Sequence, residues 1–286
     1  MAKIKIITDS NSGITQNEAK ELGIFVIPMP FTVDGEEYLE DISITQEKFF
    51  EFLNSDADVK TSQPSRFYLE ELFDNLLTDN DEIVYIPMSS GLSGTCENAT
   101  ALAQNYEGKV FVVNNTRISV TQKQSVLDAI KLAGNGKSGS QIKQILEEKG
   151  KNQSIYIMVG TLKYLKKGGR ISGAAATLGS LLKIKPILFS NGGKFDKFAI
   201  ALNTVQAKRK MIDQVKQELA TKFSKSITDG TLVISVAHTN NYNEAVKFKE
   251  EILKELSNVC FKFVDSLSLS VACHIGPGAL AIAVCE

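Results

Sequence analysis

The sequence predicts an α/β protein of two domains, a parallel-sheet domain followed by a mixed or antiparallel α/β domain. The chain has 286 residues, a length at which a single hydrophobic core usually divides into two. Its first half alternates short β-rich runs with helical patterns, which is the signature of a parallel sheet covered by helices. Its second half contains Asn-Gly-Gly at 191–193 between two β-rich runs. This is a hairpin signal and indicates antiparallel strands.

The elements of the first half follow from apolar periodicity and from helix-start signals. Residues 15–18 (TQNE) have capping-box spacing and should open a helix that runs through Leu22. The predicted strands are 3–8, 24–31, 81–87 and 110–114. The further predicted helices are 46–53, 67–77, about 96–104 and about 120–132. We expect this half to be doubly wound, with helices on both faces of the sheet.

The second half has a different pattern of predicted helices and strands. A short basic helix at 162–170 ends in two glycines, and small and apolar residues at 172–184 predict a further helix. The predicted strands are 154–160, the two arms of the hairpin within 186–202, 231–238 and 261–264. Amphipathic helices are predicted at about 204–223 and 242–256. The boundary should lie near 150–160, giving domains 1–155 and 156–286.

Composition and charge exclude several classes of function. Hydrophobic residues make up 43% of the chain and charged residues 23%, as in an ordinary soluble globular protein. The formal net charge is −1, so the chain has no overall positive field that would hold nucleic acid phosphates. We therefore expect no nucleic acid partner.

The ends of the chain and its cysteines point to the cytoplasm. The N-terminal MAKIKIITDS has no apolar segment of the kind that directs export. Apolar runs such as ALAIAVC at 279–285 are far too short to span a bilayer. The four cysteines form no CxxC pair, so we expect neither a zinc site nor a disulfide framework. We predict a soluble, cytoplasmic protein with reduced thiols, no metal and no cofactor.

Residues 89–95 (SSGLSGT) are the strongest candidate for a binding loop. They follow the predicted strand 81–87 and precede a predicted helix. Ligands of open α/β sheets bind beyond the carboxyl ends of the strands, where glycines allow close approach and hydroxyls and helix N-termini donate hydrogen bonds. Residues 61–65 (TSQPS) could add donors to the same crevice. Each stretch is also consistent with a polar turn that only caps a helix.

The motifs raise three other interpretations. GLSGT at 91–95 lacks the last glycine of a nucleophile elbow, but Ser93 and His274 could still serve a serine hydrolase. A binding module for another small anion also stays open. GNGKSG at 134–139 matches a dinucleotide fingerprint, yet it links two predicted helices instead of a strand and a helix. We interpret it as a helix end and linker.

Six motifs in order resemble those of the DegV family: ITDS at 7–10, TSQPS at 61–65, SSGLSGT at 89–95, LKYLKKGGRIS at 162–172, KIKPIL at 183–188 and HIGPGALAI at 274–282. The resemblance spans nearly the whole chain and implies a two-domain DegV-like fold that binds one long-chain fatty acid between its domains. It further implies a non-enzymatic, acyl-binding subunit of a bacterial fatty acid kinase system. A separate kinase subunit would phosphorylate the carboxyl group, and the acyl phosphate would feed phospholipid synthesis.

The resemblance also implies roles for individual residues. It places carboxylate recognition on Thr61, Ser62, Ser93 and His274, with a backbone amide near Gly94. It places kinase coupling on Arg170 of the GGRIS motif.

The chain departs from the family pattern at three points. Asn114 and Asn115 stand where an Asp-Ser pair is usual, and Ile275 where threonine is commoner. Residues 202–205 (LNTV) stand where an Arg-Thr-Arg run often follows the hairpin, with Lys208, Arg209 and Lys210 close by.

The expected ligand is physically reasonable. About fourteen buried methylenes supply roughly 11 kcal/mol before the costs of association. The carboxylate must be paired, because an isolated buried carboxylate costs several kcal/mol or becomes protonated. We expect the helix at 172–184 to form part of the acyl tunnel wall, and a transient contact with a membrane surface during transfer.

Overall fold

The computed structural model describes residues 2–55, 57–177, 184–256 and 259–286. The chain forms two compact units. Unit 1 comprises Met1–Lys151 and Ser268–Ser270, and unit 2 comprises Asn152–Leu267 and Val271–Glu286. The short segment 268–270 therefore packs with unit 1, although the chain on both sides of it belongs to unit 2. Each unit has its own sheet, and the predicted α/β fold class is confirmed.

Unit 1 is built on a parallel sheet with strand order β2-β1-β6-β7. Its strands are β1 (Ile4–Asp9), β2 (Phe25–Ile27), β6 (Glu82–Ile86) and β7 (Val110–Val112). Successive side chains of a strand point to opposite faces of the sheet, and here both faces are buried. Ile6 contributes to one core cluster and Ile7 to the other, and both are buried.

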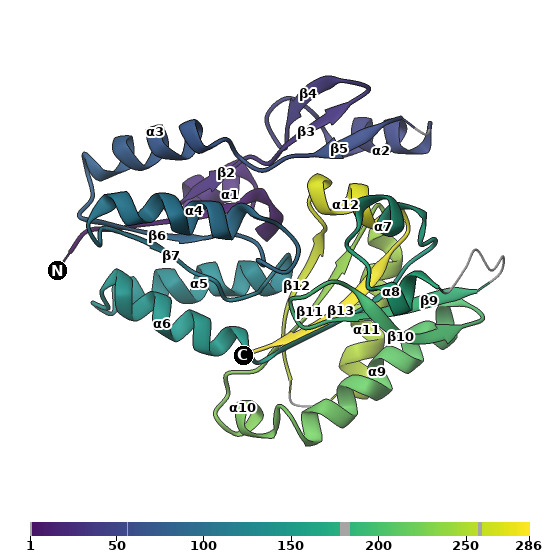
Figure 1. Cartoon of the computed structure of the whole chain (residues 1–286). Helices are drawn as coiled ribbons and strands as arrows, with labels where there is room; N and C mark the ends of the chain where they lie inside the picture. The colour runs from purple at the N-terminus through teal and green to yellow at the C-terminus, as the bar shows by residue number, and fades with distance from the viewer. Residues whose placement is uncertain (1, 56, 178–183, 257–258) are drawn as a thin grey trace. The chain divides into compact units, whose positions relative to one another are not determined.

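Helices cover both faces of this sheet (Figure 1). One face packs against α1 (Gln16–Leu22), α5 (Val120–Gly134) and α6 (Gly139–Gly150). The other face packs against α3 (Arg66–Leu77) and α4 (Thr95–Ala103). Two 3-10 turns, η1 (Ser10–Ser12) and η2 (Gln104–Tyr106), follow β1 and α4. The doubly wound arrangement expected for the first half is what the structure has.

A second, antiparallel sheet in unit 1 was not predicted. It has the order β4-β3-β5 and comprises β3 (Pro30–Val33), β4 (Glu36–Leu39) and β5 (Val59–Thr61), with α2 (Gln46–Asn54) beside it. The single strand expected at 24–31 was wrong. The run divides into β2 and β3, which lie in different sheets, and the prolines at 28 and 30 lack the N–H that a continuous strand needs.

Unit 2 is built on a six-stranded sheet with the order β10-β9-β8-β13-β11-β12. Its strands are β8 (Gln153–Met158), β9 (Lys185–Ser190), β10 (Asp196–Ala201), β11 (Val233–His238), β12 (Cys260–Ser266) and β13 (Leu280–Cys285). Only the β11–β12 pair is parallel, as expected for a mixed sheet. The hairpin predicted around 191–193 is the β9–β10 pair. The apolar run 279–285, which is too short to span a bilayer, forms the inner strand β13.

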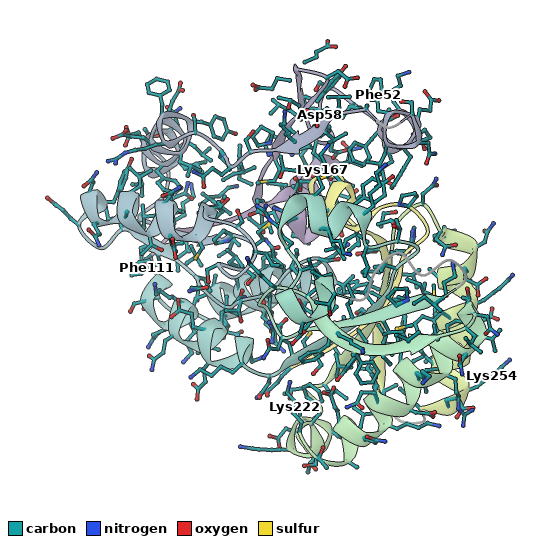
Figure 2. The ribbon with its side chains drawn as sticks, turned by 45° about the vertical axis from the view of Figure 1, so that its right-hand side comes forward. Phe52, Asp58, Phe111, Lys167, Lys222 and Lys254 are labelled. Carbon is teal, nitrogen blue, oxygen red and sulfur yellow. The ribbon has the colours of Figure 1, made fainter. Side chains whose placement is uncertain are left out.

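The main helices of unit 2 are α9 (Thr204–Ala220) and α11 (Tyr242–Glu255), which pack on one face of the sheet. Ile252 of α11 is buried against the sheet, whereas Lys254 of the same helix is exposed (Figure 2). Lys222 follows α9, and its ammonium group donates to the Ser154 hydroxyl at 3.0 Å. The shorter helices are α7 (Lys163–Gly168), α8 (Gly173–Ala176), α10 (Ser224–Thr228) and α12 (Leu269–Ile275). Of the helix predicted at 172–184, α8 is the described part, and residues 178–183 lie outside the described residues.

Along β13, the two faces of the unit 2 sheet carry side chains of different size. Leu280, Ile282 and Val284 of β13 face the cluster formed with α9 and α11. The residues that alternate with them, Ala281 and Ala283, are small and are also buried. The face turned away from α9 and α11 is therefore lined by small side chains along β13.

The described parts of the chain contain no helix that is long and apolar enough to cross a membrane. All four cysteines are free thiols, three of them buried and Cys260 exposed. No group of three or more histidine, cysteine, aspartate or glutamate side chains suited to a metal ion occurs among the described residues.

Candidate functional site

The loop between β6 and α4 lies at the carboxyl edge of the parallel sheet in unit 1. Its backbone is folded back on itself, because the carbonyl of Ser89 accepts hydrogen bonds from the N–H groups of Leu92 and Ser93, both at 3.1 Å. The N–H of Ser89 in turn donates to the Arg117 carbonyl at 2.8 Å. Gly94 is the N-cap of α4 and supplies no side-chain cap. The loop thus presents the start of a nine-residue helix, which favours anions.

Ser93 is half-buried, and its hydroxyl is paired locally. The Ser93 Oγ lies 2.9 Å from the Thr95 Oγ1 and accepts a hydrogen bond from the Thr95 N–H at 3.2 Å. Within the described part of the chain these partners of the Ser93 hydroxyl include no base that could remove its proton. The hydroxyl is therefore set up as a hydrogen-bond donor or acceptor and not as an activated nucleophile.

The loop 61–65 adjoins the loop 88–94 in the same unit. Thr61 ends β5 opposite Phe31, and the Ser62 N–H donates to the Pro30 carbonyl at 3.0 Å. A Cβ atom placed on Gly94 would lie only 3.3 Å from the side-chain oxygen of Gln63. The structure therefore brings Thr61, Ser62, Ser93 and Gly94 into neighbouring loops of one unit.

Asp9 lies beside these loops and was not assigned a role from the sequence. It ends β1, and no part of it is exposed. Its Oδ1 accepts hydrogen bonds from the Asn11 N–H at 3.1 Å, the Asn11 amide at 3.0 Å and the Gln122 amide at 3.0 Å. Its Oδ2 accepts from the Met88 N–H at 2.9 Å. Burial raises the pKa of Asp9, and these hydrogen bonds oppose that rise.

A second buried carboxyl, Glu40, follows β4. Its oxygens accept hydrogen bonds from the Ser10 hydroxyl at 2.6 Å and from the Leu269 N–H at the start of α12. Burial raises the pKa of Glu40 to about 7 against the effect of these donors. The side-chain oxygen of Asn11 accepts a hydrogen bond from the Ser270 hydroxyl. Asn11 is therefore linked directly to the segment 268–270, and Ser10 is linked to it through Glu40.

In unit 2, His274 lies in the last turn of α12 against the backbone of Gly168. A Cβ atom on Gly168 would fall 2.1 Å from the imidazole Nδ1, so only glycine leaves room for the ring. Arg170 donates from its guanidinium to the Gly168 carbonyl. Burial, and then the positive charge of Arg170, lower the pKa of His274 to about 4. His274 is thus a neutral imidazole near neutral pH, with a permanent cation close by.

Glycine also shapes the loop that follows His274. Gly276 has φ = +83°, and a Cβ there would lie 2.5 Å from the Tyr164 ring. Tyr164 belongs to the basic helix α7, where the Lys163 ammonium lies 5.7 Å from its ring centroid. Lys167 of the same helix is exposed (Figure 2).

Two residues at or near the departures from the family pattern have structural roles. Lys208 is buried, and its ammonium forms ion pairs with Glu244 at 2.7 Å and Glu251 at 2.5 Å. It joins α9 to α11 and is not a surface cation. Asn115 is buried, and its side-chain oxygen accepts a hydrogen bond from the Arg117 N–H at 3.2 Å.

The predicted site residues fall into two groups. Thr61, Ser62, Ser93 and Gly94 belong to unit 1, whereas His274 and Arg170 belong to unit 2. Sequence reasoning included Asp9 in the ITDS motif without a function for it, and it missed Glu40. For Asp9, the available signal was its position directly after the predicted buried strand 3–8, because a buried carboxylate needs hydrogen-bonded partners. Glu40 adjoins no predicted strand, so it had no such signal.

Comparison with known proteins gives a consistent result. The family model described as "Uncharacterised protein, DegV family" matches residues 3–286. The chain is 32% identical over 286 residues to Protein DegV of Bacillus subtilis (strain 168), covering 99% of both chains. It is 31% identical over 285 residues to a DegV domain-containing protein, SA1258, of Staphylococcus aureus (strain N315), again covering 99% of both.

Solved structures match over the same length. A DegV family protein from Thermus thermophilus, described in terms of its fatty acid binding, superposes with a TM-score of 0.89 at 26% identity, covering 99% of both chains. DegV from Bacillus subtilis, described as a fatty acid binding protein, gives a TM-score of 0.84 at 30% identity, covering 100% of this chain and 99% of the other.

Proposed function

This chain belongs to the DegV family, and we propose that it binds one long-chain fatty acid and presents the carboxyl group to a partner kinase. The observation that carries the proposal is the pair of adjoining loops in unit 1, which gather hydroxyl and backbone donors at a helix start. The fatty acid binding described for the Bacillus subtilis and Thermus thermophilus proteins supports it.

The donors of unit 1 suit a carboxylate that has to react afterwards. Thr61, Ser62 and Ser93 carry hydroxyls, and the N-terminus of α4 favours negative charge without neutralising it fully. Hydroxyl donors satisfy a carboxylate that would otherwise be too costly to bury. Because they bring no full counter-charge, they leave the oxygens nucleophilic enough for phosphoryl transfer.

His274 and Arg170 keep the roles that family membership suggests, carboxylate recognition and kinase coupling. A neutral imidazole can donate one hydrogen bond without fixing a charge. Arg170 is suited to phosphate because its guanidinium is planar and always charged. We further propose that the protein has no complete active site and that the acyl phosphate is formed with a separate kinase and used in phospholipid synthesis.

For the acyl chain, we propose the small-residue face of the unit 2 sheet as one wall. Ala281 and Ala283 are small and buried, so a larger side chain at either position would add volume on this face of β13. Apolar surface of this kind binds methylene groups through their removal from water, at about 0.8 kcal/mol for each. Ala281→Leu should therefore shorten or deplete the bound acyl chains, whereas Ala174→Leu on the exposed side of α8 should leave them unchanged.

The deciding experiment is organic extraction of the purified protein followed by mass spectrometry, with uptake of oleate and palmitate measured in parallel. We expect about one fatty acid per chain. A protein that contains no fatty acid and takes up none would overturn the proposal. Stabilisation by inorganic phosphate without lipid uptake would instead favour the small-anion module. Hydrolysis of acyl esters without a partner, abolished by Ser93→Ala, would favour a hydrolase.

A further inference from the structure

Asp9 is a costly group to place where it is. A fully buried carboxylate has lost its water, and it persists only if hydrogen bonds or charges replace that water. Four donors from three residues meet its two oxygens: two from Asn11, one from Gln122 and one from Met88. A buried polar network of this kind, placed at the ligand-binding edge of a sheet, is more than the core needs to fold.

The bond to Met88 connects Asp9 to the loop that carries Ser93. Met88 is the second residue after β6, and its N–H donates to the Asp9 Oδ2. Ser89 follows directly, and its carbonyl accepts the N–H of Ser93. The path from the carboxylate to the Ser93 backbone therefore runs through two hydrogen bonds and one peptide unit. A shift of Asp9 would move the whole loop.

The carboxylate is itself held in one orientation. Gln122 of α5 is fully buried, and its amide nitrogen also lies 3.1 Å from the Thr8 hydroxyl oxygen and 3.1 Å from the Ile86 carbonyl oxygen. Asn11 occupies the other side of Oδ1. Three donors hold Oδ1, which fixes the orientation of the carboxylate. In this orientation Oδ2 accepts the hydrogen bond from the Met88 N–H.

We propose that Asp9 is a positioning residue for the headgroup site: its carboxylate fixes the loop 88–94 so that Ser93 and the start of α4 meet the ligand carboxylate in one geometry. This inference rests on the proposed function. It assigns Asp9 no contact with the ligand and no part in proton transfer.

The test uses the full chain loaded with oleate labelled with ¹³C at the carboxyl carbon. Asp9→Asn keeps the side-chain shape but places an N–H₂ group where every partner is a donor, so the tether to Met88 or to Asn11 is lost. We expect the bound carboxyl ¹³C resonance to shift or broaden. We also expect the transfer of oleate to lipid vesicles to become roughly tenfold faster, as the loss of one hydrogen bond to a charged group implies.

A second variant and a control separate positioning from stability. Gln122→Met is nearly isosteric and removes one donor to Asp9, so it should change the resonance and the release rate in the same direction by about threefold. Ser226→Ala is the matched control, because the Ser226 hydroxyl is a buried donor to the Glu286 carboxylate in unit 2. It should lower stability without changing either readout.

The outcomes are distinguishable. If the wild-type chain takes up no oleate, the proposed function fails and the role of Asp9 fails with it. If the wild-type chain binds oleate and both variants give the wild-type resonance and release rate, the positioning role alone is wrong. The same conclusion follows if Ser226→Ala changes both readouts as much as Gln122→Met does.

Discussion

The two units hold their candidate site residues by different physical means. In unit 1, Ser93 lies on a loop whose backbone is tied by hydrogen bonds to Ser89 and, through Met88, to Asp9. In unit 2, His274 is held by close packing, because its ring occupies the space where Gly168 lacks a side chain. One arrangement depends on donors and acceptors, and the other depends on the absence of a methyl group.

The difference extends to charge. The unit 1 loops offer neutral hydroxyls and a helix start, whereas unit 2 sets a neutral imidazole beside the permanent charge of Arg170. Hydrogen-bonded positions fail when a partner is removed, and packed positions fail when an atom is added. Substitutions can therefore be chosen that break one arrangement and leave the other intact.

The largest effect is expected from Ser93→Ala, which removes a donor from unit 1. The formation of acyl phosphate with a cognate kinase should slow by about a hundredfold, in the range found when one donor to a reacting oxygen is lost. Fatty acid affinity should fall much less, because most of it comes from the acyl chain. Single-turnover phosphorylation and equilibrium binding measure the two. Thr78→Ala, which removes an exposed hydroxyl bonded to the Asn75 carbonyl, is the control, and an unchanged phosphorylation rate in Ser93→Ala would rule out its role.

The next effect is expected from Gly168→Ala, which adds an atom in unit 2. The new Cβ would lie 2.1 Å from the His274 Nδ1, so the ring must move. Overpacking of this kind costs about 1–3 kcal/mol, and fatty acid binding should weaken by roughly tenfold if His274 contacts the carboxylate. Gly173→Ala is the matched control, because nothing lies within 4 Å of its added atom. Equal binding by both variants would separate His274 from the ligand.

Unit 1, whose site loops are held by hydrogen bonds, was easier to predict from the sequence than unit 2. Thr15 caps α1 as its spacing indicates, and α4 begins at Thr95, directly after the glycine of the predicted loop. These features are local, and turn and cap residues act within a few positions of the chain. The hairpin between β3 and β4 was missed, although its turn is Asp34-Gly35 and both residues have positive φ angles of 50° and 90°. That dipeptide is a known hairpin signal.

Long-range features could not be predicted. The contact between His274 and Gly168 joins residues more than a hundred positions apart, and nothing in either local sequence specifies it. The sequence also does not indicate that Lys208 of α9 forms ion pairs with Glu244 and Glu251 of α11. Sequence pattern gives the element, whereas the partner across the fold depends on topology.

A smaller effect is expected from Arg170→Ala, which removes the permanent charge from unit 2. Because Arg170 lowers the pKa of His274, the pKa should rise in this variant while remaining below its ordinary value through burial. NMR titration of the imidazole measures this. Acyl phosphate formation should slow by about fivefold with lipid affinity near normal, since a charged group that is not fully buried contributes on the order of 1 kcal/mol to docking. Loss of lipid binding instead would place Arg170 at the carboxylate.

The smallest net effect is expected in the dependence of stability on pH, because Glu40, which is buried, and His274, which is partly exposed, act in opposite directions. Glu40 in unit 1 has a folded pKa of about 7, above its ordinary value of 4.5. The folded chain therefore binds its proton more tightly, and Glu40 adds stability as the pH falls from 7 to 4.5. His274 in unit 2 has a folded pKa of about 4, below 6.5. Its contribution is complete above pH 6.5 and is lost as the pH falls towards 4.

Single variants should uncover the two slopes that cancel in the wild-type chain. Glu40→Gln removes the gain on acidification, so it should lose stability relative to the wild type between pH 8 and pH 5, by up to about 3 kcal/mol. His274→Asn removes the loss of stability that protonation of His274 causes on acidification, so this variant should gain stability relative to the wild type as the pH falls from 8 to 5. The gain should be smaller than the effect of Glu40→Gln, because the ring is partly exposed. Urea unfolding at pH 5, 6, 7 and 8 measures both. Parallel curves for Glu40→Gln and the wild type would mean that Glu40 stays ionised throughout, held by the Ser10 hydroxyl and the N–H groups of α12, and unit 1 would then hold two buried carboxylates by hydrogen bonds alone.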